Sequence, residues 1–134
     1  MPDLIDLEIA TPERQLVREH VSEVQLPGKS GYMGILPGHA ALLGQLGTGA
    51  LTYVVDGRKR TLSVHGGFVE VLPDQVRVLA NVAERAEEID IEKARAELAR
   101  ANQEVINPAL GVDPAVALEA LSWAQARVEA AAQK

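Results

Sequence analysis

Hydrophobic and polar residues follow two different periods along the chain, and the change comes near residue 82. Before that point, short stretches alternate apolar and polar residues, as in strands that bury one face. We expect strands at 4–9, 19–26, 32–36, 42–46, 51–55, 58–64, 68–72 and 75–80. Many short strands separated by turns favour an antiparallel sandwich or barrel, and we assign residues 1–84 to an antiparallel β-sandwich.

Glycine and proline mark the expected turns of this region. Asp56-Gly57 separates two β-type stretches and favours a type I′ hairpin turn, because both central residues of that turn need a positive φ. Gly66-Gly67 is interpreted as a further strand-connecting turn. Glycines and prolines also concentrate in 27–38, where a structured loop would offer a docking surface. Turns that serve only the sandwich explain each of those glycines equally well.

After residue 82, apolar residues recur in steps of three and four, which is typical of amphipathic helices. Asn107-Pro108 should end a first helix, and Asp113-Pro114 should begin a second as N-cap and first helical residue. The two expected stripes are Ile91, Ala94, Leu98, Ala101 and Val105, and Ala117, Leu121, Ala124, Val128 and Ala131. The pattern predicts an αα-hairpin over residues 85–134 and an α+β fold class overall.

Alanine dominates both stripes of the expected hairpin. Small side chains allow the helices to approach closely but remove little apolar area from water. One interpretation is a weakly attached hairpin that can open or dock again. The other is a rigid hairpin with close alanine packing. The sequence leaves both open.

Composition and charge exclude several classes of protein. The chain has 134 residues, 47% of them hydrophobic, with one Phe, one Trp and two Tyr, so its core must be aliphatic. A net charge of −6 argues against nucleic acid as a partner and against adsorption to anionic lipid. The absence of cysteine excludes disulfides and thiolate chemistry. No apolar stretch approaches the ~20 residues of a membrane-spanning helix, and no signal peptide is visible. We expect a soluble, intracellular protein that meets a membrane only through protein partners.

Two local patterns resemble catalytic motifs but lack the residues that the chemistry needs. Gly28-Lys29-Ser30 is similar to the end of a phosphate-binding loop, yet Glu23 stands where the first glycine belongs. His65-Gly66-Gly67 is similar to an oxyanion-hole segment, but the chain has no Gly-x-Ser-x-Gly nucleophile elbow. The three histidines lack the spacing of zinc ligands. We therefore expect a non-catalytic protein with no required cofactor and no metal site.

Three stretches carry a resemblance to a known family. They are LPGKSGYMGILPGHA at 26–40, VHGGFVEV with VRVLA at 64–80, and AE with EIDIEKA at 83–94. In order and spacing they resemble the epsilon subunit of F-type ATP synthases. The resemblance implies a rotor subunit of the central stalk that couples proton-driven rotation to ATP synthesis. Its sandwich would bind the gamma subunit and the ring of c subunits, at the cytoplasmic face of a bacterial inner (plasma) membrane.

The resemblance also implies a regulatory role for the hairpin. It would either fold against the sandwich or extend into the catalytic head, where it would meet the alpha and beta subunits and restrain ATP hydrolysis. Basic residues of the extended hairpin would face acidic residues there. The second helix offers only Arg127 and Lys134, against Glu119 and Glu129, so we expect weak inhibition. The expected interface residues are Gly31, Tyr32, Met33, Leu36, Pro37, His39 and Arg95.

Some bacterial members of the family bind ATP, which favours the compact form. Their Ile/Leu-Asp-x-x-Arg-Ala motif is matched by 89–94, with Lys93 in place of arginine. Matching by spacing gives a possible ATP site of Glu84, Asp90, Lys93, Arg100 and Arg127. Trp123 stands near the place of another expected arginine. An ammonium is a point charge rather than a bidentate fork, and spaced ion pairs on a solvated helix explain the same residues. We expect weak ATP binding or none.

Two other classes of function remain open on the sequence. One is a free-standing nucleotide-sensing module without a rotary partner, in which the hairpin would clamp the ligand. The other is a β-sandwich hydrolase, which the missing nucleophile disfavours. Co-purification with a membrane ATPase would separate the first of these from a stalk subunit.

Overall fold

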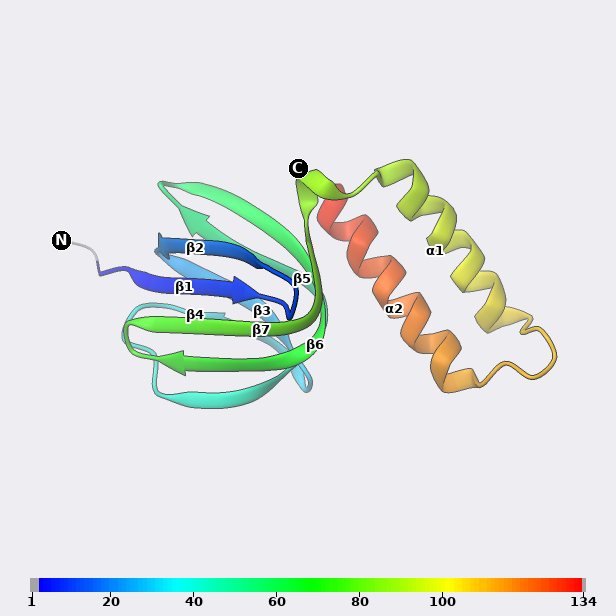
Figure 1. Cartoon of the computed structure of the whole chain (residues 1–134), viewed down its shortest axis with the longest axis horizontal. Coiled ribbons are helices and arrows are strands. Elements are labelled where there is room, and N and C mark those ends of the chain that lie inside the picture. The colour runs from blue at the N-terminus through cyan, green and yellow to red at the C-terminus, as the bar shows by residue number, and fades with distance from the viewer. Residues whose placement is uncertain (1–2, 134) are drawn as a thin grey trace.

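The computed structural model describes residues 3–133, which form a β-sandwich followed by a helical hairpin (Figure 1). All seven strands belong to one hydrogen-bonded sheet in the order β2-β1-β7-β6-β5-β3-β4. The strands are β1 (Ile5–Ala10), β2 (Gln15–Val21), β3 (Glu23–Gly28), β4 (Gly31–Ile35), β5 (Leu42–Val55), β6 (Arg58–Leu72) and β7 (Gln75–Arg85). The expected α+β class, a sandwich and then a hairpin, is confirmed.

One strand pair departs from the expected antiparallel pattern. β1 runs parallel to β7, with Ile9 opposite Val78. Parallel neighbours cannot be joined by a short turn. The two strands are far apart in the sequence, and β1 reaches β7 as one arm of the β1–β2 hairpin. Every other pair in the sheet is antiparallel.

The strands are longer than their sequence patterns predict. The stretches at 42–46 and 51–55 form one strand, β5, and those at 58–64 and 68–72 form β6. The interpretation of Gly66-Gly67 as a turn is wrong, because β6 continues through both residues at φ values of 69° and 124°. Positive φ bends a strand without ending it. Bent long strands let a single sheet fold over into two layers (Figure 1).

Two strand boundaries can be compared with the sequence prediction. One confirms it, and the other divides a stretch that was expected to form a single strand. Asp56 and Gly57 have φ values of 51° and 74° and close the β5–β6 hairpin, which confirms the predicted turn. The expected strand at 19–26 is instead two strands that separate at Ser22, whose backbone N–H donates to Val54 at 2.9 Å. The core between the layers is almost wholly aliphatic; its largest fully buried side chains include Leu7, Ile9, Leu26, Leu51, Leu62 and Val64.

The hairpin begins after a single 3-10 turn, η1 (Ala86–Glu88), and consists of α1 (Ile91–Ile106) and α2 (Pro114–Ala131). The Asp90 carboxylate caps α1 by accepting hydrogen bonds from two backbone N–H groups, and Asp113 caps α2. The predicted start of the second helix at Asp113-Pro114 is confirmed. Figure 1 shows α2 between the sandwich and α1, so α2 is the helix that attaches the hairpin.

Candidate functional site: the contact between the sandwich and the hairpin

α2 is buried along two faces rather than one. The predicted stripe that includes Ala117, Ala124 and Ala131 is buried, in keeping with its packing on α1. A second stripe, at the helical spacing of Glu119, Trp123, Ala126 and Ala130, contains two further buried alanines. Glu119 and Trp123 on this stripe contact the sandwich, so the second stripe is the docking face of the hairpin. Most of its buried side chains are methyl groups, which remove little apolar area from water.

Arg127 lies on the border between these two faces and joins three elements. Its Nε donates to Glu84 Oε1 of β7 at 2.7 Å, and its Nη1 donates to Glu97 Oε2 of α1. The Arg127 side chain is only 17% exposed. Burial by itself lowers the pKa of Arg127, but the hydrogen bond and charge of Glu84, together with Glu97, outweigh it and the pKa is raised. The guanidinium therefore stays charged while it bridges the sandwich to both helices.

His65 of β6 makes the second polar contact with α2. Its Nε2 lies 3.2 Å from Glu119 Oε1, and its Nδ1 lies 2.7 Å from Thr48 Oγ1 of β5. The imidazole centroid is 5.5 Å from that of Trp123, with the ring planes tilted by 42°. His65 is therefore placed between a sandwich hydroxyl and two side chains of the docking face.

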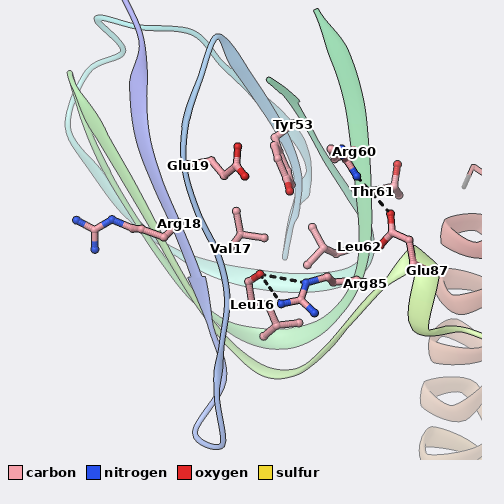
Figure 2. A pocket seen from close by; sticks show the side chains of 10 residues that line it. All are labelled: Leu16, Val17, Arg18, Glu19, Tyr53, Arg60, Thr61, Leu62, Arg85 and Glu87. Atoms are coloured by element: carbon pink, nitrogen blue, oxygen red, sulfur yellow. Dashed lines mark hydrogen bonds and ion pairs between the residues drawn. The ribbon is translucent and has the colours of Figure 1, made fainter. Parts of the chain in front are cut away.

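The segment that leads into the hairpin is fastened to the sandwich. Arg14 donates two hydrogen bonds to the Glu88 carboxylate, at 2.8 and 2.9 Å. Arg85 donates from Nε and Nη2 to the Leu16 carbonyl, and Figure 2 shows this link inside a hollow of about 300 Å³. In the same hollow, burial raises the pKa of Tyr53, and Arg60 pairs with Glu87 at 3.8 Å. The Arg14 and Arg60 pairs join η1 to the sandwich, and the Arg85 bonds join the end of β7 to β2. The chain up to Glu88 therefore moves with the sandwich.

The expected interface residues of the sandwich lie along its edge strand rather than in one patch. Gly31, Tyr32 and Met33 belong to β4, the last strand of the sheet, and Tyr32 accepts a hydrogen bond from the Ala50 N–H. The following loop carries exposed Leu36, half-buried Pro37 and half-buried His39, and it lies at the end of the sandwich away from the helices (Figure 1). Arg95 is separate from both, exposed on α1 and paired with Glu92.

An exposed apolar face, which the sequence analysis did not single out, lies on β5, β6 and β7. Phe68 is 57% exposed and stands opposite Leu79, itself 51% exposed; Leu43 nearby is 75% exposed. Glu70 and Arg77 lie beside these three apolar residues. A signal was present in the sequence. Val69 and Val71 point inward, so Phe68 occupies an outward position where strand alternation places polar residues.

Comparison with known proteins decides the family. Residues 4–86 match the family model described as the ATP synthase, Delta/Epsilon chain, beta-sandwich domain. The ATP synthase epsilon chain of Solibacter usitatus is 65% identical over 134 residues, which cover the whole of both chains. The chain belongs to the ATP synthase epsilon chain family. Another epsilon chain, from Carboxydothermus hydrogenoformans, is 50% identical over 103 residues, 77% of each chain.

Solved structures agree with the epsilon-chain assignment. A chain of the Euglena gracilis mitochondrial ATP synthase, solved as OSCP, F1 and c-ring, superposes with a TM-score of 0.82 at 29% identity, over 98% of this chain and 83% of that one. A chain of the Tetrahymena thermophila central stalk and c-ring shares the fold, with a TM-score of 0.57 at 15% identity over 98% and 95%. Membership makes the protein a non-catalytic subunit of an ATP synthase. No helix within residues 3–133 has the length and apolar character to cross a membrane.

The structure brings together only part of the ATP site expected for an epsilon chain. Glu84 and Arg127 are in contact, but as partners of one another. The carboxylate of Asp90 caps the α1 backbone. Lys93 is exposed, and Arg100 lies with Trp123 along a groove of about 420 Å³ between α1 and α2. ATP binding therefore stays a prediction. Lys134, expected to add a positive charge to α2, lies outside the described residues.

The sequence did not reveal the partners of Arg127 and His65. Glu84 is 43 residues from Arg127, and the His65–Thr48 and His65–Glu119 contacts join three separate elements. No local pattern links such residues. The one usable signal is charge placement, because Glu97 and Arg127 carry opposite charges directly beside the two apolar stripes through which the helices pack.

Proposed function

We propose that this epsilon chain is a rotor subunit of the central stalk that couples proton-driven rotation to ATP synthesis and restrains ATP hydrolysis through its hairpin. The observation that carries the proposal is the separation of the molecule into two buried clusters. One fills the sandwich, and the other consists of Ile89, Ala94, Ala130 and Ala131 at the base of the hairpin. The hairpin can leave without opening the sandwich core.

The way in which the hairpin is attached supports release as a rigid pair of helices. The bonds of Arg14 and Arg85 fasten the chain up to Glu88, so the pivot lies at 89–90, before the Asp90 cap. Beyond it, α1 and α2 keep their alanine-lined contact with each other. What must break is the docking face of α2, together with the Arg127 and His65 contacts and the hydrogen bond from the Thr61 hydroxyl to Gln133 at 3.4 Å.

The sandwich offers two surfaces to the rest of the rotor. Leu43, Phe68 and Leu79 form an exposed apolar face, and exposed apolar patches are typical of protein interfaces. We assign this face and the edge strand β4 to the gamma subunit and the c-ring. The alpha and beta subunits would meet the hairpin only when it is extended. The site of action is then the cytoplasmic face of a bacterial plasma membrane, reached through the complex.

ATP is not required by this arrangement, and we propose that it binds weakly or not at all. Arg127 is already neutralised by two carboxylates, and Lys93 lacks the bidentate geometry of arginine. Calorimetric titration of the full chain with ATP and Mg²⁺ tests this point. Tight binding that is lost in Asp90→Ala would overturn it.

The regulatory part of the proposal is tested by removing the hairpin. A chain that ends at Glu88 retains every strand and the hinge contacts, so it should still assemble. The reconstituted enzyme is then expected to hydrolyse ATP faster than the enzyme with the full chain. Equal rates would refute inhibition by the hairpin. Failure of the full chain to co-purify with an F-type ATPase would instead favour a free-standing nucleotide-sensing module.

A further inference from the structure

The strongest unassigned feature is the ion-pair cluster formed by Arg127, Glu84 and Glu97. It is the point at which α2, β7 and α1 meet through one side chain. The Glu84 carboxylate accepts hydrogen bonds from two Arg127 nitrogens, Nε at 2.7 Å and Nη2 at 3.5 Å, and the Glu97 carboxylate accepts one from Nη1. Three of the five guanidinium N–H donors of Arg127 therefore bind the two carboxylates.

The three residues of the cluster belong to parts of the fold on both sides of the hinge. Glu84 lies near the end of the last sandwich strand, before the hinge, and Glu97 lies one helical turn beyond Ala94, the buried residue of α1. Glu97 and Arg127 both belong to the hairpin, whereas Glu84 belongs to the sandwich. Undocking of the hairpin must therefore break the Arg127–Glu84 pair, while the Arg127–Glu97 pair can persist.

The cluster carries a net negative charge without an added ligand. The Arg127 side chain is 17% exposed and faces two negative charges, so the local charge is −1 when all three groups are ionised. A nucleoside triphosphate would add several negative charges at a place that already carries one excess negative charge. An anion bound to the Arg127 guanidinium would lie beside the carboxylates of Glu84 and Glu97, which would repel it.

We propose that Arg127 is a built-in latch that docks the hairpin without nucleotide, with Glu84 and Glu97 as the internal anions that hold it. This inference deepens the proposed function, because it says what keeps the inhibitory hairpin in its docked state. ATP is then neither needed for docking nor able to strengthen it.

The latch can be tested on the full isolated chain. Because the chain contains no cysteine, spin labels on Asp74→Cys in the sandwich and Gln103→Cys in α1 form a single labelled pair. Both positions are exposed. Pulsed electron paramagnetic resonance without nucleotide should give one narrow distance distribution for the docked chain. Millimolar ATP with Mg²⁺ should leave it unchanged.

Variants identify the residue responsible. Arg127→Gln should raise the undocked-to-docked ratio by about tenfold, because loss of a hydrogen bond to a charged group shifts an equilibrium by about that factor or more. Arg100→Gln, which removes an exposed cation of the groove, is the matched control and should remain docked. Glu84→Gln, which removes the sandwich charge and leaves the Arg127–Glu97 pair in place, should raise the undocked-to-docked ratio to a similar extent.

Each outcome separates the latch from its alternatives. An undocked fraction that is unchanged in Arg127→Gln or in Glu84→Gln, or a wild-type chain that docks only with ATP, would each overturn the latch. None of these results would bear on whether the hairpin inhibits the enzyme. That question is decided by the ATPase rate after removal of the hairpin, so the latch and the proposed function can fail independently.

Discussion

Filling the alanine contact between α2 and the sandwich should release the hairpin and leave the sandwich intact. Ala126 is buried and lies on the docking face, with Trp123 and Ala130. Replacing it with leucine adds three carbons where the helix approaches closely. The matched control is Gln125→Leu, which adds a similar side chain to the adjacent, exposed position of the same helix. Alanine, glutamine and leucine all have high helix propensities, so neither substitution weakens α2 itself by much.

The size of the effect follows from how little holds the docking face. Two buried methyl groups, Ala126 and Ala130, contribute about 0.8 kcal/mol each, and the Arg127–Glu84 pair contributes about 1–3 kcal/mol. Overpacking a close contact costs about 1–3 kcal/mol, which is of the same order as the Arg127–Glu84 pair. At about 2 kcal/mol the undocked-to-docked ratio rises roughly 30-fold. The sandwich has a separate buried cluster and should keep its own free energy of unfolding.

Trp123 provides the assay, because it is the only tryptophan and its ring lies 5.5 Å from that of His65 in the docked form. Ala126→Leu should shift its emission to longer wavelength, whereas Gln125→Leu should leave it unchanged. In the reconstituted enzyme, Ala126→Leu should lower the ATPase rate, since more hairpins are free to extend. Identical emission in the two variants would refute the reasoning, as would cooperative loss of the sandwich in Ala126→Leu.

Three further changes probe the hinge, the strand bend and the apolar face. Gly67→Ala should destabilise the sandwich by about 2 kcal/mol or more in urea unfolding, because φ is +124° and a Cβ would overlap the Leu79 carbonyl oxygen; Gly34→Ala meets open space and should cost much less. The hydrogen bond from Arg14 holds the pKa of Glu88 below its usual range, so this pair stabilises the fold above about pH 4.3 and loses its effect as the pH falls through the lower folded-state pKa. Arg14→Gln should therefore lower the urea midpoint at pH 7 and leave it unchanged at pH 2; an equal loss at both values would contradict the ion-pair account. Phe68→Ser should keep the stability of the isolated chain and reduce its retention in the purified complex, and unchanged retention would show that this face has no partner.

The sequence was sufficient where the structure depends on neighbouring residues. The Asp56-Gly57 turn, the Asp113 cap and the alanine stripe between the helices all follow from local chemistry. Gly66-Gly67 was misread because positive φ suits a bend inside a strand as well as a turn. The parallel pairing of β1 depends on which edge of the sheet is free, which no local pattern encodes.

The docking contact was hidden for a related reason. Glu119, Trp123, Ala126 and Ala130 mix charge, ring and methyl group, so they do not form an apolar stripe in the sequence. Only the folded chain shows that they share a face and that His65 stands opposite two of them. The sequence indicates Arg127 as part of a possible ATP site, which stays a prediction, and the residues that it binds come from elements that the sequence alone does not place together.

The central claim is that the hairpin must leave the sandwich in order to restrain hydrolysis. It is tested most directly by tethering the hairpin in place. Thr48→Cys and Glu119→Cys introduce the only thiols, on side chains that both contact His65, and a flexible bismaleimide can join them. The tethered enzyme should hydrolyse ATP as fast as the enzyme that lacks the hairpin, while the unjoined double variant should remain slower. Equal inhibition with and without the tether would contradict the account.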